Sequence, residues 1–317
     1  MKIPLLILGG RDRRGTVLPA EGQDKQPLQG YKGADLRIGG RPLVEVAIER
    51  WRGCGAFDPI YIAGPARIYE RLGLDARVAD TDGELGENLR AGLARMEADG
   101  GPGQIAVTTC DILPDPVELA NAVEDLHRHQ PLDFWMPICP VPDASRLGAS
   151  AWKPKYWVRS PEAAEAVPIL PGHLMIGTPP ILRLRFLYQL FDQLYQTRNR
   201  PLAYRRMVLT RSLLGSLLKE DLRHLLGFGL PYITVGVVYN VLALVSKIAA
   251  RRVTTTDFED HLRRAFIRRA HRRAFPERRG RVVIMPCLSL AKDIDTVEEA
   301  REVAASLGKK ATGAAAS

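Results

Sequence analysis

Two aspartates stand where a carboxylate can hold a divalent cation. Asp111 follows a short apolar run and precedes a helix start, and Asp295 occupies the same kind of position late in the chain. Neither is needed to cap the following helix, because Asp115 and Thr296 fill those roles. Magnesium takes one or two protein carboxylates together with phosphate oxygens. The pair therefore predicts a magnesium site that acts on a phosphorylated ligand.

A glycine- and arginine-rich turn follows the first apolar run of the chain, in the letters LGGRDRRG from Leu8 to Gly15. Glycines let backbone N–H groups approach phosphates, and the arginines add positive charge. The spacing is neither G-x-G-x-x-G nor that of a P-loop, which argues against hydride transfer and against a P-loop enzyme. The alternative is a surface turn with solvated arginines.

Lys32 lies in the segment YKGADLRIGGRPLVE, ahead of an expected short strand, a glycine turn and a helix. An ammonium group fixed over the glycine-rich turn can stabilise charge that builds on a transferred phosphoryl group. The alternative is a solvated lysine, the most frequent environment for this residue. Lys25 is a weaker candidate for the same role.

The elements that position these residues alternate between strands and helices. Apolar runs predict strands at residues 3–8, 59–63 and 104–109, and helical periodicity predicts helices at 42–51 and 86–96. Such alternation is typical of an α/β domain with a mainly parallel sheet. The candidate residues then fall at the carboxyl ends of strands, where open α/β sheets bind ligands.

The domain organisation follows from a change in character after residue 179. Residues 1–179 are expected to form the core, 180–280 a mostly helical insertion, 281–307 the returning strand and helix of the core, and 308–317 a disordered tail. Residues 228–246 carry no charge. One membrane span there would separate Asp111 from Asp295, so a buried helix is the better prediction.

Composition favours a protein that binds anions in a reducing compartment. The chain has 317 residues and a net charge of +9, which favours nucleotides, phosphorylated metabolites or acidic surfaces. Its four cysteines form no C-x-x-C pair, which argues against a disulfide framework or a zinc site. A cytoplasmic location is expected. The nine arginines between residues 259 and 281 accompany no nucleic-acid motif, so no nucleic-acid partner is expected.

Four segments in this order resemble a nucleotidyltransferase superfamily that includes MobA-like (molybdenum-cofactor guanylyltransferase-like) proteins and sugar-phosphate nucleotidylyltransferases. They read LILGGRDRRG, YKGADLRIGGRPLVE, IAVTTCDILPDP and DIDTVEEA. The resemblance covers residues 3–140 and 281–307, and only loosely 180–280. It implies a three-layer α/β/α fold with a mainly parallel, mixed sheet, that is, a GT-A/Rossmann-like core.

The resemblance also implies Mg²⁺-dependent transfer of a nucleoside monophosphate from a nucleoside triphosphate to a phosphorylated small-molecule acceptor, with release of pyrophosphate. It assigns Lys32 to the α-phosphate and Arg11 to catalysis, and Asp111 and Asp295 to Mg²⁺. In the stretch GENL, Asn88 is the expected contact to base and ribose. The implied nucleotide contacts are Leu8, Gly9, Gly10, Arg11 and Asn88.

Two departures from the superfamily pattern stand out. Gly9 replaces the usual alanine of its glycine-rich turn, and Val297 replaces the usual proline of its last motif. The long stretch between Gly15 and Lys32 also leaves the alignment of Lys32 open to the alternative at Lys25.

Two other functions remain as alternatives. A glycosyltransferase with a nucleotide-sugar donor is one, because D-x-D occurs at residues 80–82 and 293–295. A non-catalytic, membrane-peripheral binding protein built on residues 180–281 is the other, with peripheral membrane contact as a minority expectation. His173 lies in an apolar, glycine-containing turn and is expected to be structural.

Overall fold

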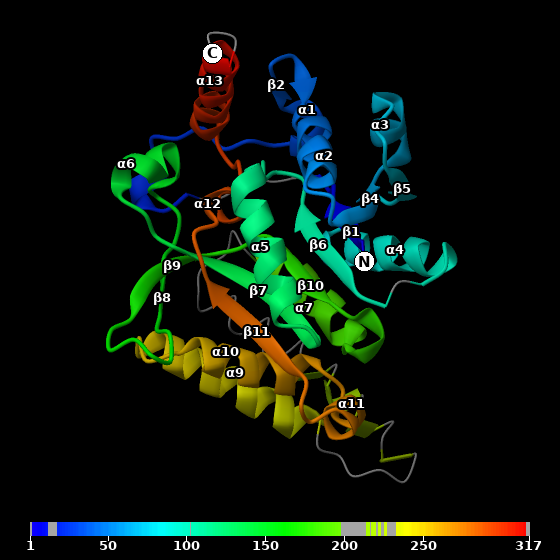
Figure 1. Ribbon diagram of the computed structural model, residues 1–317. Helices are drawn as coiled ribbons and strands as arrows, with labels where there is room; N and C mark the ends of the chain where they lie inside the picture. The colour runs from blue at the N-terminus through cyan, green and yellow to red at the C-terminus, as the bar shows by residue number, and fades with distance from the viewer. Residues whose placement is uncertain are drawn as a thin grey trace.

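The computed structural model describes residues 2–11, 18–101, 103–197 and 233–314, with short pieces between 214 and 226. Residues 12–17, the second half of the arginine-rich turn, lie outside the described residues. A nine-stranded sheet forms the centre of the described part (Figure 1).

The first half of the sheet is parallel. The apolar run at the start of the chain forms β1 (Ile3–Leu8), which pairs with β4 (Phe57–Gly64) on one side and β6 (Ile105–Thr109) on the other. Next to β4 lies β5 (Arg77–Asp80). The carboxyl ends of β1 and β6 are therefore neighbours, as the sequence predicts for adjacent strands of a parallel sheet.

The second half of the sheet is mixed. β10 (Met175–Gly177) runs antiparallel between β6 and β7 (Leu132–Pro140). β9 (Val167–Pro171) pairs antiparallel with both β7 and β8 (Tyr156–Val158). β11 (Arg279–Ile284) adds to β7 in parallel and begins two residues before the strand that the sequence predicts at 281–285.

Helices cover both faces of the sheet. Side chains alternate along each strand, so β1 has apolar side chains on both faces that need to be covered. Leu5 and Ile7 of β1 pack in a core with α2 and α5, whereas Leu6 and Leu8 pack on the opposite face with α4 and α7. This confirms the predicted α/β class with helices on both sides of a mainly parallel sheet. The covering helices are α2 (Leu43–Gly53), α5 (Pro116–Arg128), α4 (Leu85–Ala98) and α7 (Leu184–Thr197).

Short elements complete the connections between strands and the larger helices. They are η1 (Ala20–Gly22), α1 (Lys32–Asp35), β2 (Arg37–Ile38), β3 (Arg41–Pro42), α3 (Ala66–Tyr69), η2 (Glu70–Leu72), α6 (Ala144–Leu147), η3 (Gly148–Ser150), η4 (Pro179–Ile181) and α12 (Leu288–Ala291).

The predicted helix starts are present. The Asp115 side chain accepts hydrogen bonds from two backbone N–H groups at the start of α5. The backbone N–H of Glu299 donates to Thr296 Oγ1, and its carboxylate accepts from the backbone of Thr296, as a capping box does. The last helix, α13 (Val297–Ala314), runs past the predicted end near Leu307, through a stretch that contains lysine and alanine. Most of the predicted disordered tail is therefore helical.

The helices of residues 180–280 pack against the core at two places. α7 lies against α4, while α10 (Thr255–Phe266) contacts β11 and α9 (Ile233–Ala249). In Figure 1, α9 and α10 run along the end of the molecule opposite α13, with α11 (Arg269–Ala274) nearby. The prediction of a buried helix within residues 228–246 is wrong for one face of α9, because only its other face packs on α10. In the described part of the chain, no helix has the length and apolar character to cross a membrane.

A buried carboxylate attaches these helices to the sheet. Asp133 of β7 has no exposed surface and accepts hydrogen bonds from Arg263 Nε at 2.6 Å and His271 Nε2 at 2.8 Å. The Arg278 side chain lies 3.7 Å from the same carboxylate. Of the nine arginines between residues 259 and 281, several therefore pair with carboxylates of the protein: Arg263 and Arg278 with Asp133, and Arg281 with Asp125.

We predict that Asp133→Ala lowers the free energy of unfolding by about 3–5 kcal/mol, because it leaves buried cations without their counter-charge. Chemical denaturation measures this change. The control is Asp260→Ala, since Asp260 is exposed and lies 4.0 Å from Arg264; its effect stays within about 0.5 kcal/mol. Equal, small effects of the two substitutions would show that Asp133 does not attach the helices.

Candidate functional site

A cleft of about 250 Å³ opens at the carboxyl ends of β1 and β6. This is the edge of the sheet at which open α/β folds bind ligands. Seven of the eight predicted site residues line the cleft, and the eighth, Gly9, is the chain neighbour of two of them, Leu8 and Gly10. The lining residues are Leu8, Gly10, Arg11, Lys32, Gly83, Glu84, Leu85, Asn88, Thr109, Cys110, Asp111, His173, Tyr195, Asp293 and Asp295.

The two glycines after β1 pack closely against other side chains. Gly9 continues the strand by donating its N–H to the carbonyl of Ala63, and its own carbonyl accepts from the hydroxyl of Tyr69 at 2.8 Å. A Cβ at Gly9 would lie 2.7 Å from the Tyr69 ring. A Cβ at Gly10 would collide with the side-chain amide of Asn88. The turn therefore needs glycine at Gly9, while a side chain at Gly10 would displace the Asn88 amide.

Asn88 lies in the first turns of α4, whose N-terminus lies at the cleft. It is 1% exposed, and its Oδ1 accepts a hydrogen bond from Thr81 Oγ1 at 3.1 Å. Helix α7 closes over the same corner, because Asp192 accepts from the backbone N–H of Gly86 and Tyr195 lines the cleft. The positive end of the α4 dipole and this amide are groups that suit an anionic, hydrogen-bonding ligand.

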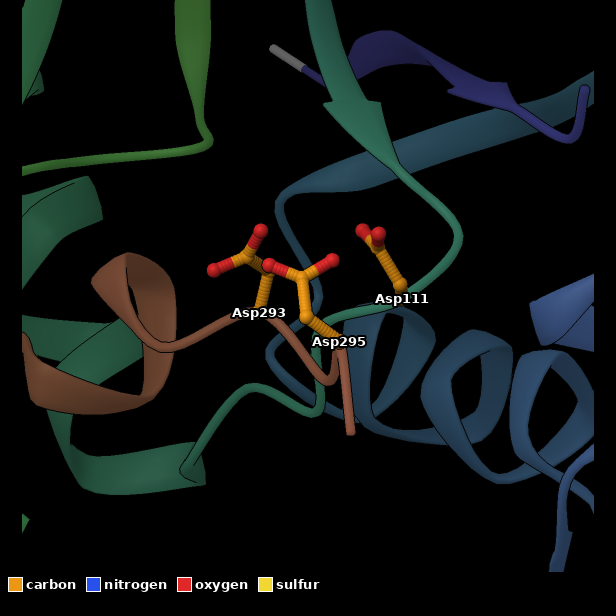
Figure 2. A group of neighbouring side chains, drawn as sticks. All are labelled: Asp111, Asp293 and Asp295. Atoms are coloured by element: carbon orange, nitrogen blue, oxygen red, sulfur yellow. The ribbon is translucent and has the colours of Figure 1, made fainter. Parts of the chain in front are cut away.

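Three carboxylates meet at the floor of the cleft (Figure 2). Asp111 follows β6, while Asp293 and Asp295 come from the segment between α12 and α13. One oxygen of each lies within 4.8 Å of the others. The backbone N–H of Ile294 donates to the carbonyl of Asp111 at 2.8 Å and so fixes the two segments against each other. The sequence analysis names Asp293 only as part of the D-x-D at residues 293–295 and not as a magnesium ligand.

Two buried lysines form ion pairs with the carboxylates. Lys32 Nζ lies 2.5 Å from one oxygen of Asp295 and 3.5 Å from Asp111. Lys153 Nζ lies 3.2 Å from the other oxygen of Asp295 and also pairs with Asp293. Lys32 begins the short helix α1, ahead of the short strand β2, a glycine turn and helix α2 as the sequence predicts, and it is 4% exposed rather than solvated.

The charges of this cluster shift several pKa values. Burial alone would raise the pKa of Asp295, but Lys153 and Lys32 outweigh burial and hold that pKa far below its usual range. Burial also opposes the charge on Lys153, yet Asp293, Asp295 and Glu299 raise its pKa above the ordinary lysine value. Burial raises the pKa of Asp293. Asp295 and Lys153 therefore stay charged at neutral pH.

The cluster fits a divalent cation on two counts. Within the described part of the chain, Asp111 Oδ1 is buried without a hydrogen-bond partner, an arrangement that is costly unless another ligand satisfies the oxygen. The two ammonium groups also face more carboxylates than they can neutralise, since Glu299 lies 3.5 Å from Lys153 beside the three aspartates. Hard oxygen ligands in this number suit Mg²⁺.

Other predicted residues lie elsewhere or differ in environment. Lys25, the alternative to Lys32, pairs with the neighbouring Asp24 at 2.7 Å and is absent from the cleft lining. The D-x-D at residues 80–82 also lies outside the carboxylate cluster: Asp80 accepts from the backbone N–H of Ala66. His173, expected to be structural, lines the cleft with Nε2 3.6 Å from Asp293.

Sequence reasoning missed Tyr195, which lines the cleft, and Lys153, which pairs with the carboxylates but does not itself line the cleft. Lys153 reaches the cluster from a turn between α6 and β8, and its contacts are more than 100 positions away in the chain. Tyr195 donates from α7 to the backbone carbonyl of Arg11 at 3.0 Å. The one local signal at Lys153 is an isolated lysine between Trp152 and Pro154, which predicts nothing by itself.

Comparison with known proteins finds solved structures that share this fold. No protein-family model matches the chain, and no curated protein sequence matches it significantly. A hypothetical transferase from Thermus thermophilus is similar in structure with a TM-score of 0.55 and 19% identity, covering 95% of this chain and all of that one. A CMP:2-keto-3-deoxy-manno-octonic acid synthetase solved with CTP has a TM-score of 0.50 and 12% identity, covering 98% of this chain and 100% of that one. At these identities the likeness establishes a shared fold, and the MobA-like branch stays a prediction.

We predict that Gly9→Ala destabilises the protein by about 1–3 kcal/mol, the usual cost of overpacking. The Tyr69 ring cannot yield, because it is fully buried and hydrogen-bonded to the Gly9 carbonyl. Thermal denaturation followed by circular dichroism measures the loss. Gly53→Ala is the matched control, since nothing lies within 4 Å of its added Cβ. A Gly9→Ala protein as stable as Gly53→Ala would show that the turn has room for a side chain.

Proposed function

We propose that this protein is a nucleotidyltransferase, which transfers a nucleoside monophosphate from a nucleoside triphosphate to a phosphorylated small acceptor. The observation that carries the proposal is the carboxylate cluster with its two buried lysines, at the carboxyl ends of parallel strands beside a glycine-rich turn. The shared fold supports it, because the synthetase of that fold was solved with CTP.

In this proposal the triphosphate lies along the turn after β1. The backbone of Gly9 and Gly10 and the guanidinium of Arg11 receive its anionic oxygens, since arginine and backbone N–H groups both donate to phosphate. The Arg11 guanidinium lies 5.8 Å from the centre of the Tyr31 ring, which limits its range of positions. The nucleoside then extends toward the α4 N-terminus, where the amide of Asn88 is available to base or ribose.

Asp111, Asp293 and Asp295 are the residues that would hold Mg²⁺, which when bound supplies positive charge to the phosphate oxygens. A hydrogen bond to the backbone of Asp295 holds that residue in position. Glu299 accepts from the backbone N–H of Asp295 at 2.7 Å and so fixes that carboxylate at the start of α13.

The two lysines have different roles. Lys32 lies on the side of Asp111 and the glycine turn, where it stabilises charge on the α-phosphate. Lys153 does not line the cleft; it pairs with Asp293 and Asp295 and holds these two carboxylates in position. An acceptor phosphate oxygen attacks the α-phosphorus and forms the new P–O bond. The bond from that phosphorus to the bridging oxygen breaks, and pyrophosphate leaves with the electron pair.

The proposal is tested by incubating the protein with each nucleoside triphosphate, Mg²⁺ and a panel of phosphorylated sugars and alcohols. Pyrophosphate release together with a new product, in which a nucleoside diphosphate is linked to the sugar or alcohol, supports nucleotidyl transfer. Transfer of sugar from a nucleotide-sugar, with no pyrophosphate formed from any triphosphate, would instead support the glycosyltransferase alternative.

We predict that Asp111→Ala reduces Mg²⁺-dependent pyrophosphate release to the background rate. The reason is the loss of the carboxylate whose buried Oδ1 has no hydrogen-bond partner in the described residues. Pyrophosphate release measures activity, and circular dichroism confirms that the fold is kept. Asp24→Ala, which removes an exposed carboxylate paired with Lys25, retains full activity. Undiminished activity of Asp111→Ala would end this assignment.

We predict that Lys32→Ala lowers kcat by about 10²–10³-fold, as the loss of one transition-state donor does. Triphosphate affinity changes much less, because Gly9, Gly10 and Arg11 keep their contacts. Steady-state kinetics and equilibrium dialysis separate these effects. Lys25→Ala is the matched control with kcat unchanged. If Lys25→Ala shows the loss and Lys32→Ala does not, the assignment of the lysine is wrong.

A further inference from the structure

Helix α9 carries an apolar face that the described residues leave uncovered. Val235, Tyr239, Leu242 and Val245 are between 52% and 73% exposed. Their spacing of three or four residues places them on one side of the helix. Contiguous exposed apolar surface of this kind marks an interaction site more often than scattered apolar residues do.

A second group of exposed apolar side chains lies next to the N-terminal end of α9. Among the described residues between 214 and 226, five leucines are exposed, whereas Leu217 is buried in a cluster with Ile233 and Val237 of α9. Asp221 ties the two segments together by accepting from the backbone N–H groups of Ile233 and Thr234, each at 2.8 Å. The exposed leucines, which together with the described residues between them are called the leucine segment, are Leu214, Leu218, Leu222, Leu225 and Leu226.

The opposite face of α9 is fixed on the protein. Asn240 is buried, and its Oδ1 accepts a hydrogen bond from Nδ1 of His261 on α10 at 3.0 Å. Lys247 pairs with Asp257, and Leu244 is buried in a core shared with β7 and β11. The helix therefore lies lengthwise along the molecule with its apolar side outward, as a helix that rests in a membrane interface does.

Exposed arginines lie at the C-terminal end of this face. α9 contains no acidic residue, and its Lys247 is paired with Asp257 of α10. Directly after α9, Arg251 and Arg252 are exposed, and the Arg251 guanidinium lies 4.9 Å from the centre of the Trp157 ring. Lys219 is exposed within the leucine segment. Apolar side chains with cations at their border match the surface of an anionic bilayer, where headgroups meet acyl chains.

We propose that α9 and the leucine segment form a lipid-binding face that docks this protein onto an anionic membrane surface. The apolar side chains enter the boundary between headgroups and acyl chains, while Arg251, Arg252 and Lys219 contact lipid phosphates. A second copy of the chain fits less well, because a two-fold dimer would set this basic border against itself. None of these residues lines the cleft, so the lipid-binding face is independent of the proposed catalysis.

The test is co-sedimentation of the full chain with phosphatidylcholine vesicles that contain or lack phosphatidylglycerol. The protein pellets with the anionic vesicles, binds neutral vesicles much more weakly, and is partly released by salt. Leu242→Asp weakens vesicle binding by about tenfold or more, since a charge replaces a buried apolar contact. The double change Arg251→Glu and Arg252→Glu weakens binding to anionic vesicles alone.

Val117→Asp is the matched control, because Val117 is 68% exposed on α5 and lies outside the lipid-binding face. It binds vesicles like the wild type. Circular dichroism checks that each variant is folded, and sedimentation velocity without lipid reports its oligomeric state. The proposal is overturned if the wild type does not pellet with anionic vesicles, or if folded Leu242→Asp pellets equally well. A wild-type dimer that Leu242→Asp dissociates would likewise overturn it in favour of self-association.

Discussion

The cleft depends on one carboxylate that two buried ammonium groups share. Asp295 offers one oxygen to Lys32 at 2.5 Å and the other to Lys153 at 3.2 Å. Buried charges persist only when they are paired and hydrogen-bonded, so three distant chain segments must meet at this point. The cap of the last helix holds the carboxylate in place, because Glu299 accepts from the backbone of Asp295 and Thr296.

The sheet brings these segments together, and the helices of residues 180–280 enclose them. Parallel pairing of β1 with β6 places the glycine turn beside Asp111. Helix α7 then connects two surfaces of the molecule. Its Tyr195 lines the cleft, whereas its Phe186 is buried with Val237 of α9, beneath the lipid-binding face. The same helical region therefore contributes to the wall of the cleft and supports an apolar outer surface.

Local patterns were enough to predict much of the core and part of the site. Asp111 stood out because the nearby Asp115 already explains the helix cap, and the strands around it follow from short apolar runs. Lys153 left no such signal, since its partners lie 140 or more positions away and the pairing depends on the whole fold. An outward apolar face in residues 228–246 was expected only as the minority alternative to a buried helix, because apolar composition alone does not tell a buried helix from one with a single packed side.

The central claim is that Asp111, Asp293 and Asp295 form a divalent-metal site completed by a nucleoside triphosphate. Electron paramagnetic resonance of Mn²⁺, a spectroscopic substitute for Mg²⁺, tests it directly when a non-hydrolysable triphosphate is present. The account predicts that wild-type protein binds Mn²⁺ more tightly with the triphosphate than without it, and that Asp111→Asn loses this gain while Asp24→Asn keeps it. Equal Mn²⁺ binding by wild type and Asp111→Asn under both conditions would contradict the account.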